Sequence, residues 1–325
     1  MSYLYRRLIF YLVALWAAVT LNFAIPRMMP GNPAEVIYAQ HSQQLSGNPH
    51  ALDAIKASLG LSDDPMPLQY WHYLVNLVHG NLGTSFFYGP VTDIIRDRMP
   101  WTLFLLGMAS LLAFILGTML GIYCSWRRGG IADSILVPVT ALTSSFPTFF
   151  LSLLFVYYVG YKLGWFPTGG SYEQGTAPHL SLSFLWDMSY HAILPAFVIL
   201  ITSIGGWLLG MRNAMINTLA EDYVQMAVAK GLHERRVMVM YAARNAILPQ
   251  ITGFAMAIAF IVGGAFLTEL VFNYQGVGFA LINAVNNLDY PLLQGLLLFI
   301  TCCVLFANLV ADLIYARLDP RVRRT

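Results

Sequence analysis

Six long apolar runs alternate with polar segments along this chain of 325 residues, at roughly 8–26, 101–125, 135–161, 191–211, 250–271 and 291–316. A helix needs about 20 residues to cross the hydrocarbon core of a bilayer, and the runs are close to or above that length. They are continuous and lack the alternation of barrel strands. The pattern therefore predicts an all-α integral membrane protein with six transmembrane helices. Its 58% hydrophobic and 10% charged residues agree with this class.

The first run predicts an N-terminal transmembrane helix over 1–26 that is retained. Two arginines precede the run, as in a signal peptide, but no site of the small-x-small type follows it. An external loop subdomain is expected over 27–100. A five-helix core follows over 101–325 and contains a cytoplasmic loop at 212–249.

The basic residues predict the orientation, because cytoplasmic loops carry an excess of Lys and Arg. With the N-terminus inside, thirteen basic residues fall on the inner side and five on the outer side. Both termini and the loop at 212–249 are therefore expected in the cytoplasm. The outer set is Arg27, Lys56, Arg96, Arg98 and Lys162.

The external loop contains a segment with helical periodicity. Its apolar and aromatic residues are Tyr70, Trp71, Tyr73, Leu74, Leu77 and Val78. The spacing predicts an amphipathic helix of a kind that can lie at a membrane surface, and Gly80, Gly83 and Gly89 then break the pattern. Two interpretations stay open: the segment caps the bundle, or it forms a docking surface for an external partner.

The cytoplasmic stretch 221–249 contains seven charged residues in an alanine-rich context that favours helix. Tyr223, Ala227 and Gly231 are spaced four apart and so share one helical face. Gly231 suits the C-terminal end of a helix, and Glu234 suits the start of the next one. The spacing predicts a helix, a turn and a second helix. An ordinary amphipathic loop is the alternative.

The chain carries no nucleotide-binding motif and no recognisable metal site. A GxxxxGK[ST] sequence is absent, and the seven histidines form no HExxH pairing. No catalytic residue, cofactor, metal ion or nucleic-acid partner is therefore expected for this chain. A proton-coupled carrier would need several ionisable groups within the spans and an internal repeat. Of the two acidic residues near the spans, Glu269 is expected to hold the external turn at 272–290 and Asp312 to snorkel or pair near the inner surface.

The cytoplasmic stretch resembles the EAA loop of ABC importer permeases at Ala227, Gly231 and the Ile-Leu-Pro that ends at Pro249. The chain is similar to the peptide-type branch of that family almost throughout. The similar motifs lie at 28–36, 59–74, 80–86, 144–154, 221–232 and 269–295. Departures from the general pattern are Gln225-Met226-Ala227 in place of Glu-Ala-Ala, which is usual in the peptide branch, Asn32 in the external motif, and Gln275 before the Gly-x-Gly pair.

The resemblance implies the transmembrane domain of a type I ABC importer, which is a transport subunit and not an enzyme. It implies a second homologous permease subunit and two ATP-binding cassette ATPase subunits that bind ATP and Mg. An extracellular or periplasmic substrate-binding protein would deliver the substrate, and the complex would lie in a bacterial or archaeal plasma membrane. The expected ATPase-coupling residues are Tyr223, Ala227, Lys230, Gly231, Leu232, Arg235 and Arg236. The expected residues of the translocation path or external gate are Glu269, Phe272, Asn273 and Tyr274.

Substrate class is the most open part of this interpretation. The peptide branch implies short peptides. Residues 241–254 are also similar to permeases of cello- or chito-oligosaccharide systems, and importers of this branch also carry nickel chelates. A secondary carrier that works without ATP is a remote alternative.

Overall fold

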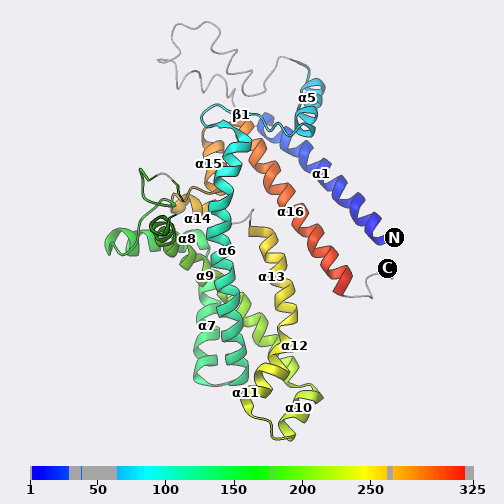
Figure 1. Ribbon diagram of the computed structural model, residues 1–325, viewed down its shortest axis with the longest axis vertical. Helices are drawn as coiled ribbons and strands as arrows, with labels where there is room; N and C mark the ends of the chain where they lie inside the picture. Colours follow the sequence, from blue (N-terminus) through cyan, green and yellow to red (C-terminus); the bar gives the residue numbers. More distant parts are fainter. Residues whose placement is uncertain are drawn as a thin grey trace. The chain divides into compact units, whose positions relative to one another are not determined.

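The computed structural model of the protein describes residues 2–28, 38, 64–176, 178, 179, 181–261 and 266–318 (Figure 1). These residues form helices and one small β-hairpin. Most of the motif at 28–36 and the C-terminal arginines lie outside the described residues. The elements are α1 (Ser2–Met28), α5 (Met66–Val78), β1 (Thr84–Ser85), β2 (Gly89–Pro90), α6 (Val91–Trp126), α7 (Ile131–Ser145), α8 (Thr148–Phe155), η1 (Val156–Lys162), α9 (Leu182–Leu219), α10 (Asp222–Ala229), α11 (Glu234–Arg236), η2 (Val237–Ala243), α12 (Arg244–Ala246), α13 (Leu248–Phe260), α14 (Phe266–Val271), α15 (Val277–Asn286) and α16 (Tyr290–Leu318).

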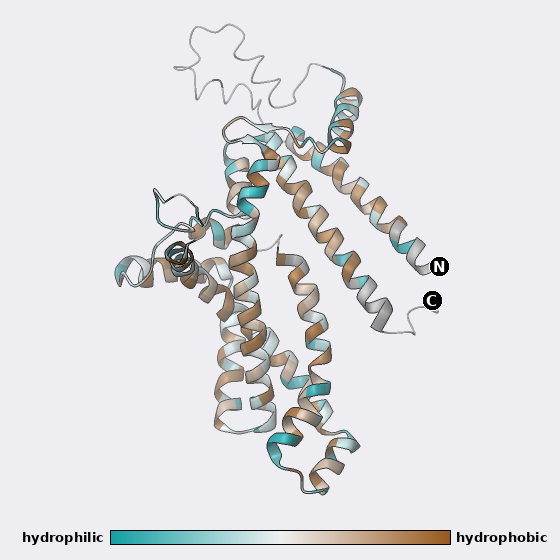
Figure 2. Ribbon diagram, viewed as in Figure 1, coloured by the Kyte–Doolittle hydropathy of each residue, from teal (hydrophilic) through white to brown (hydrophobic). Residues whose placement is uncertain are grey.

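The helical membrane architecture is confirmed, but the number of spans does not match six exactly. Among the described residues, three helices are long and apolar enough to cross a bilayer: α6, α9 and the Tyr290–Val310 part of α16 (Figure 2). The bent pair of α7 with α8 and η1 makes a fourth if it counts as one span. Shorter apolar stretches lie in α1, over Ile9–Ile25, and in α13, over Leu248–Ile258. Part of the fifth predicted run, 262–265, lies outside the described residues.

The span predicted at 135–161 is not a single straight helix. The chain bends by 95° between α7 and α8. The bend falls at Phe146, whose φ of -80° and ψ of 136° are extended, directly before Pro147. The ring of a proline clashes with a helical residue in front of it, which pushes that residue into the extended region. The third apolar run is therefore two helices joined at a sharp corner.

Contacts divide the chain into two compact units, and the first comprises the chain up to Thr102 and from Gln275 onward. Its apolar core joins the start of α6 to α15 and α16. The members of this core are Val91, Ile94, Ile95, Val277, Ala280, Ala284, Leu292, Leu293 and Leu296. At the other end of α16, Asp312 accepts hydrogen bonds from Arg7 and Tyr11 of α1. The predicted pairing of Asp312 is confirmed.

A buried polar cap precedes α16 in this unit. Asp289 accepts a hydrogen bond from the Ser85 hydroxyl at 2.5 Å through Oδ2, and one from the Leu292 N–H at 3.2 Å through Oδ1. The hydroxyl of Ser85 in turn accepts from the N–H groups of Phe87 and Tyr88. Asp289 therefore caps α16 and fixes the β-hairpin against it.

The second unit spans Leu103–Ile261 and Leu267–Tyr274 and is organised around α9. Gly117 and Gly121 of α6 lie so close to α9 that a Cβ on Gly121 would be 2.6 Å from the Leu208 carbonyl oxygen. On α7, Thr140 and Ser144 approach Gly205 of α9 equally closely. Small residues at these crossings let the helix backbones meet, as is typical of membrane helices.

Four helices end in the same hydrogen-bonded turn, a Schellman motif. In each, the residue after the cap is left-handed: Gly80 after α5, Gly231 after α10, Asn273 after α14 and Leu288 after α15, with φ of 73°, 71°, 47° and 52°. The N–H of that residue and the next one donate to carbonyls of the last helical turn. The motif satisfies carbonyls that would otherwise have no partner at the helix end.

Replacing Gly121 by alanine should destabilise the second unit by about 1–3 kcal/mol, because the added methyl overlaps the α9 backbone. The measurement is the thermal unfolding of the purified protein. Gly107→Ala is the matched control on the same helix, since no atom lies within 4 Å of its would-be Cβ. Equal midpoints for the two variants would contradict the close α6–α9 contact.

Burial raises the pKa of Asp289, while the hydrogen bonds from Ser85 and Leu292 oppose that shift. The folded state therefore holds a proton more readily than the unfolded chain. Its stability relative to Asp289→Asn should fall as the pH rises through the raised pKa. Thermal unfolding of both proteins over a pH series measures this difference, and a difference independent of pH would contradict burial as the dominant cause.

Candidate functional site

The charged stretch predicted to be cytoplasmic folds into a compact element, which we call the coupling hairpin and define as residues 221–247. Its first helix, α10, ends at Ala229 and is followed by Lys230 and the left-handed Gly231. The Gly231 N–H donates to the Val228 carbonyl at 2.9 Å, and the Leu232 N–H donates to that of Ala227 at 3.4 Å. The prediction of a helix-terminating glycine at Gly231 is confirmed.

The second arm begins at Glu234, as predicted. The ring of His233 caps α11 by accepting a hydrogen bond from the Arg235 N–H at 3.3 Å, and Glu234 is the first helical residue. Beyond Arg236 the arm continues as the π-helix η2, which the sequence did not predict, and then as α12. The predicted helix, turn and second helix are therefore present, with a wider helical turn in the second arm.

The two arms pack on a small apolar core. Val224, Ala227 and Val237 are buried against each other. Leu232 packs against this core next to the turn, and Trp126, Leu219 and Tyr241 complete it. Ala227 therefore faces the interior of the coupling hairpin, which revises its expected place on a docking face. Its small side chain instead allows the arms to approach closely.

Tyr223 connects the first arm to the end of the second. Its hydroxyl accepts a hydrogen bond from the Asn245 side-chain amide at 2.7 Å and lies 3.4 Å from the Tyr241 carbonyl oxygen. The ring remains exposed at the edge of the hairpin. Tyr223 can therefore brace the element and still contact a partner.

The second arm is fixed to the membrane helix that precedes the hairpin. Met211 and Met215 near the end of α9 are buried against Ala242, Ala243 and Ala246. The alanines lie on successive turns of η2 and α12, so their small side chains bring this arm against α9. The coupling hairpin is thus packed against the last turns of α9 and does not hang from a free linker.

An ion pair holds a neighbouring loop to the same part of α9. Arg212 donates through Nε and Nη2 to the two carboxylate oxygens of Asp133, at 2.7 and 3.0 Å. The Gly129 N–H donates to the same carboxylate at 3.0 Å. The loop between α6 and α7 is therefore tied to the helix that supports the coupling hairpin. A bidentate pair of arginine and carboxylate fixes the relative orientation of the two side chains.

The outer face of the coupling hairpin combines basic and apolar side chains. Lys230, Gly231, Arg235 and Arg236 are exposed, as expected for coupling residues, whereas Leu232 is half-buried. Within the described part of the chain, no ion pair involves these three basic residues.

Met226 and Val228 of α10 are each 58% exposed and were not predicted as contact residues. Their exposure follows from the composition of the short helix. Val224 and Ala227 fill the buried face of the eight-residue α10, so its other apolar side chains are left outside that face. Large exposed apolar residues beside a polar rim are typical of protein contact sites. Met226 and Lys230 are four residues apart and lie on one side of the helix, where they form a candidate contact surface with the basic residues, whereas Val228 points to a different side.

The four expected path or gate residues are close in sequence but differ in exposure. Glu269, Phe272 and Tyr274 are buried, and Asn273 is exposed in a left-handed conformation. The Tyr274 N–H donates to the Glu269 carbonyl at 2.8 Å, so Glu269 helps to hold this turn through its backbone. The Phe272 carbonyl accepts from the Gly170 N–H at 2.9 Å. This conformation packs the turn against residues 169–170, and the gate role stays a prediction.

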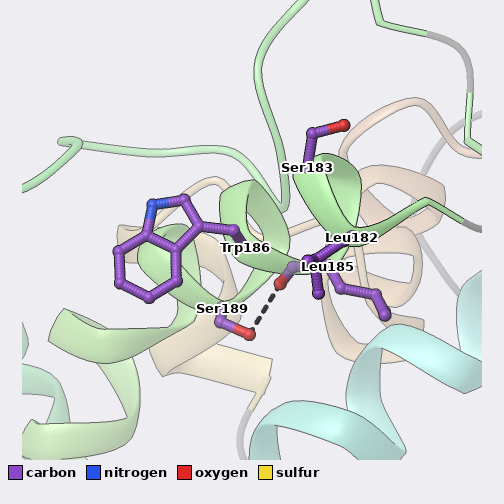
Figure 3. Close-up of a pocket in the computed structure, with 5 residues that line it drawn as sticks. All are labelled: Leu182, Ser183, Leu185, Trp186 and Ser189. Atoms are coloured by element: carbon purple, nitrogen blue, oxygen red, sulfur yellow. Dashed lines mark hydrogen bonds between the residues drawn. The ribbon is translucent and has the colours of Figure 1, made fainter.

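A hollow at the start of α9 offers little chemistry. Its lining residues, Leu182, Ser183, Leu185, Trp186 and Ser189, all come from one helix (Figure 3). The Ser189 hydroxyl donates to the Leu185 carbonyl at 2.7 Å. Substrate sites combine apolar walls with convergent polar groups from several elements, so we assign no substrate to this hollow.

Comparison with known proteins identifies the family. Residues 117–324 match the family described as the binding-protein-dependent transport system inner membrane component, and residues 1–106 match its N-terminal model. A putative peptide permease of Brucella ovis is 36% identical over 100% of both chains. The di/tripeptide transport system permease DppB of Pseudomonas aeruginosa is 33% identical and the oligopeptide transport system permease AppB of Bacillus subtilis 30%, each over 99% of both chains. The chain belongs to the family of binding-protein-dependent transport system inner membrane components.

Proposed function

We propose that this chain is a membrane-spanning permease subunit of an ATP-driven importer that takes up short peptides. The observation that carries the proposal is the match of two family models over nearly the whole chain, together with relatives of the same length that are named as peptide permeases. In this family a binding protein accompanies the membrane component. The chain would receive peptide from such a protein outside the membrane.

The contact surface of the coupling hairpin is our proposed docking site for an ATP-binding cassette subunit. Met226 would enter an apolar part of the partner's cleft, and Lys230, Arg235 and Arg236 would meet acidic groups at its rim. The complete transporter would contain a second related permease and two ATPase subunits, which bind ATP and Mg. The excess of basic residues on one side supports a cytoplasmic location for this surface and for both termini.

The mechanism rests on how the coupling hairpin is attached. Closure of the ATPase dimer would move the hairpin, and the packing of Met211 and Met215 against its alanines would pass the movement to α9. The spanning helices would then exchange between inward and outward openings around a path for the peptide. The hairpin is a transmission element, because ATP hydrolysis takes place in the partner.

Peptides are the substrate class that the relatives' names support. The three relatives described above are all named as peptide permeases, and none of those names mentions a sugar or nickel. The cognate binding protein should therefore bind di- or oligopeptides in calorimetric titrations, with little heat from cello- or chito-oligosaccharides or a nickel chelate. Binding of oligosaccharides alone would contradict the peptide assignment. ATP-independent uptake into proteoliposomes that lack the ATPase would contradict the importer itself.

Replacing Gly231 by leucine should abolish ATP-dependent peptide uptake and leave membrane insertion intact. No atom lies within 4 Å of its would-be Cβ, so the new side chain would project from the contact surface. The turn itself should still form, because Leu288 adopts the same left-handed conformation after α15. The expected loss is therefore steric and arises at the ATPase contact.

Gly80→Leu is the matched control for this substitution. Gly80 ends α5 in the same motif, with φ of 73° and equally open surroundings. Both variants introduce backbone strain of about 1–2 kcal/mol. Uptake should be lost only with Gly231→Leu. Normal uptake by both variants would refute the docking proposal, and loss in both would point to strain and not to docking.

A further inference from the structure

Helix α5 is attached to α1 by a row of side chains on one face. The Tyr70 hydroxyl lies 2.8 Å from the Thr20 hydroxyl, and the Tyr73 hydroxyl accepts from the Asn22 amide at 3.4 Å. The ring of Phe23 packs against both tyrosines, with centroids 5.1 and 5.6 Å apart. These contacts fix α5 beside α1, as Figure 1 shows.

The end of α1 is part of the same contact. Arg27 donates to the Gln69 side chain at 3.2 Å, and its guanidinium lies 3.7 Å from the centre of the Phe23 ring. Arg27 also donates to the Phe23 carbonyl. The position of α5 along α1 is therefore set by the last two turns of α1.

The opposite face of α5 carries an apolar stripe, defined as Leu68, Trp71, Val75 and Val78. Their spacing of three, four and three residues places them in one row along the helix. They are 42%, 62%, 37% and 87% exposed, so nothing in the described part of the chain covers the stripe. Helix α5 contains no Asp, Glu, Lys or Arg.

The level of α5 along the apolar stretch of α1 indicates what covers the stripe. The apolar stretch of α1 runs over Ile9–Ile25, so the contacts of Thr20, Asn22, Phe23 and Arg27 lie where this stretch ends. A helix held at that level is beside the boundary between acyl chains and headgroups. Tryptophan favours this layer, with its ring among apolar groups and its N–H in contact with water.

We propose that α5 lies in the lipid interface at the external end of α1, with Leu68, Trp71, Val75 and Val78 inserted between the lipids. The stripe extends the lipid-facing surface of α1, whose Leu21 and Ile25 are also exposed near this end. The external subdomain is thereby anchored to the bilayer at a second point, beyond the transmembrane helices. The absence of charge on α5 favours lipid over the polar rim of a protein contact.

Spin labelling of the assembled transporter in bilayer nanodiscs tests the proposal. In a background with Cys124, Cys302 and Cys303 replaced by alanine, single cysteines at Val75 or Val78 carry a nitroxide on the stripe. Asn76→Cys is the matched control, since it is exposed on the same helix but lies off the stripe. Collision with lipid-soluble oxygen and with a water-soluble nickel chelate is measured for each label by power-saturation EPR.

The ratio of oxygen to nickel collisions should be several-fold higher at Val75→Cys and Val78→Cys than at Asn76→Cys. Equal ratios at all three positions, dominated by the nickel chelate, would overturn the proposal. Nickel access at the stripe that is lost when the binding protein is added would also overturn it and identify a protein-docking face. ATP-dependent uptake by each labelled variant confirms that the protein is folded. Trp71→Tyr provides a second variant, in which the label at Val78 should still collide more often with oxygen than with the nickel chelate.

Discussion

The contact of the coupling hairpin with α9 is the interaction on which the proposed mechanism depends. Met211 and Met215 are buried against alanines of η2 and α12, and the first arm is held to the second by Val224, Ala227 and Val237. Protein interiors packed in this way transmit displacement because they are stiff. A loosely tethered hairpin could bind an ATPase, but it could not impose the movement of that partner on a spanning helix.

Helix termination is the second constraint, and it sets where individual helices end. A helix leaves carbonyls without partners at its C-terminal end and N–H groups without partners at its N-terminal end, which is costly in and near a bilayer. The chain meets this cost with Schellman turns after α5, α10, α14 and α15 and with the Asp289 carboxylate at the start of α16. The elements to which we assign proposed roles lie next to these ends: α5, the coupling hairpin, and the turn after α14. Gly231 ends α10 in a left-handed conformation, and its lack of a side chain leaves the candidate contact surface open.

Local patterns in the sequence were sufficient to predict some of these features and insufficient for others. The apolar runs, the glycine at 231 and the glutamate at 234 act through their own helix, so their roles could be predicted. The corner at Pro147 was missed because a proline alone does not predict a corner: Pro100, Pro138 and Pro195 lie inside helices that continue past them. The inward position of Ala227 depends on Val237, and the Ser85–Asp289 cap joins residues 204 positions apart. Such pairings are set by tertiary packing, which periodicity along one segment does not contain.

The most direct test of the account is whether the coupling hairpin and the end of α9 move as one body. Nitroxide labels at Gln225 and Asn213, both exposed, report the distance between the hairpin and α9 in the assembled transporter. Double electron–electron resonance with and without ATP, in a hydrolysis-deficient complex, should give the same distance distribution in both states while ATP binding closes the ATPase dimer. A distribution that shifts or broadens when ATP binds would mean that the hairpin hinges at residues 219–221, and it would contradict rigid transmission.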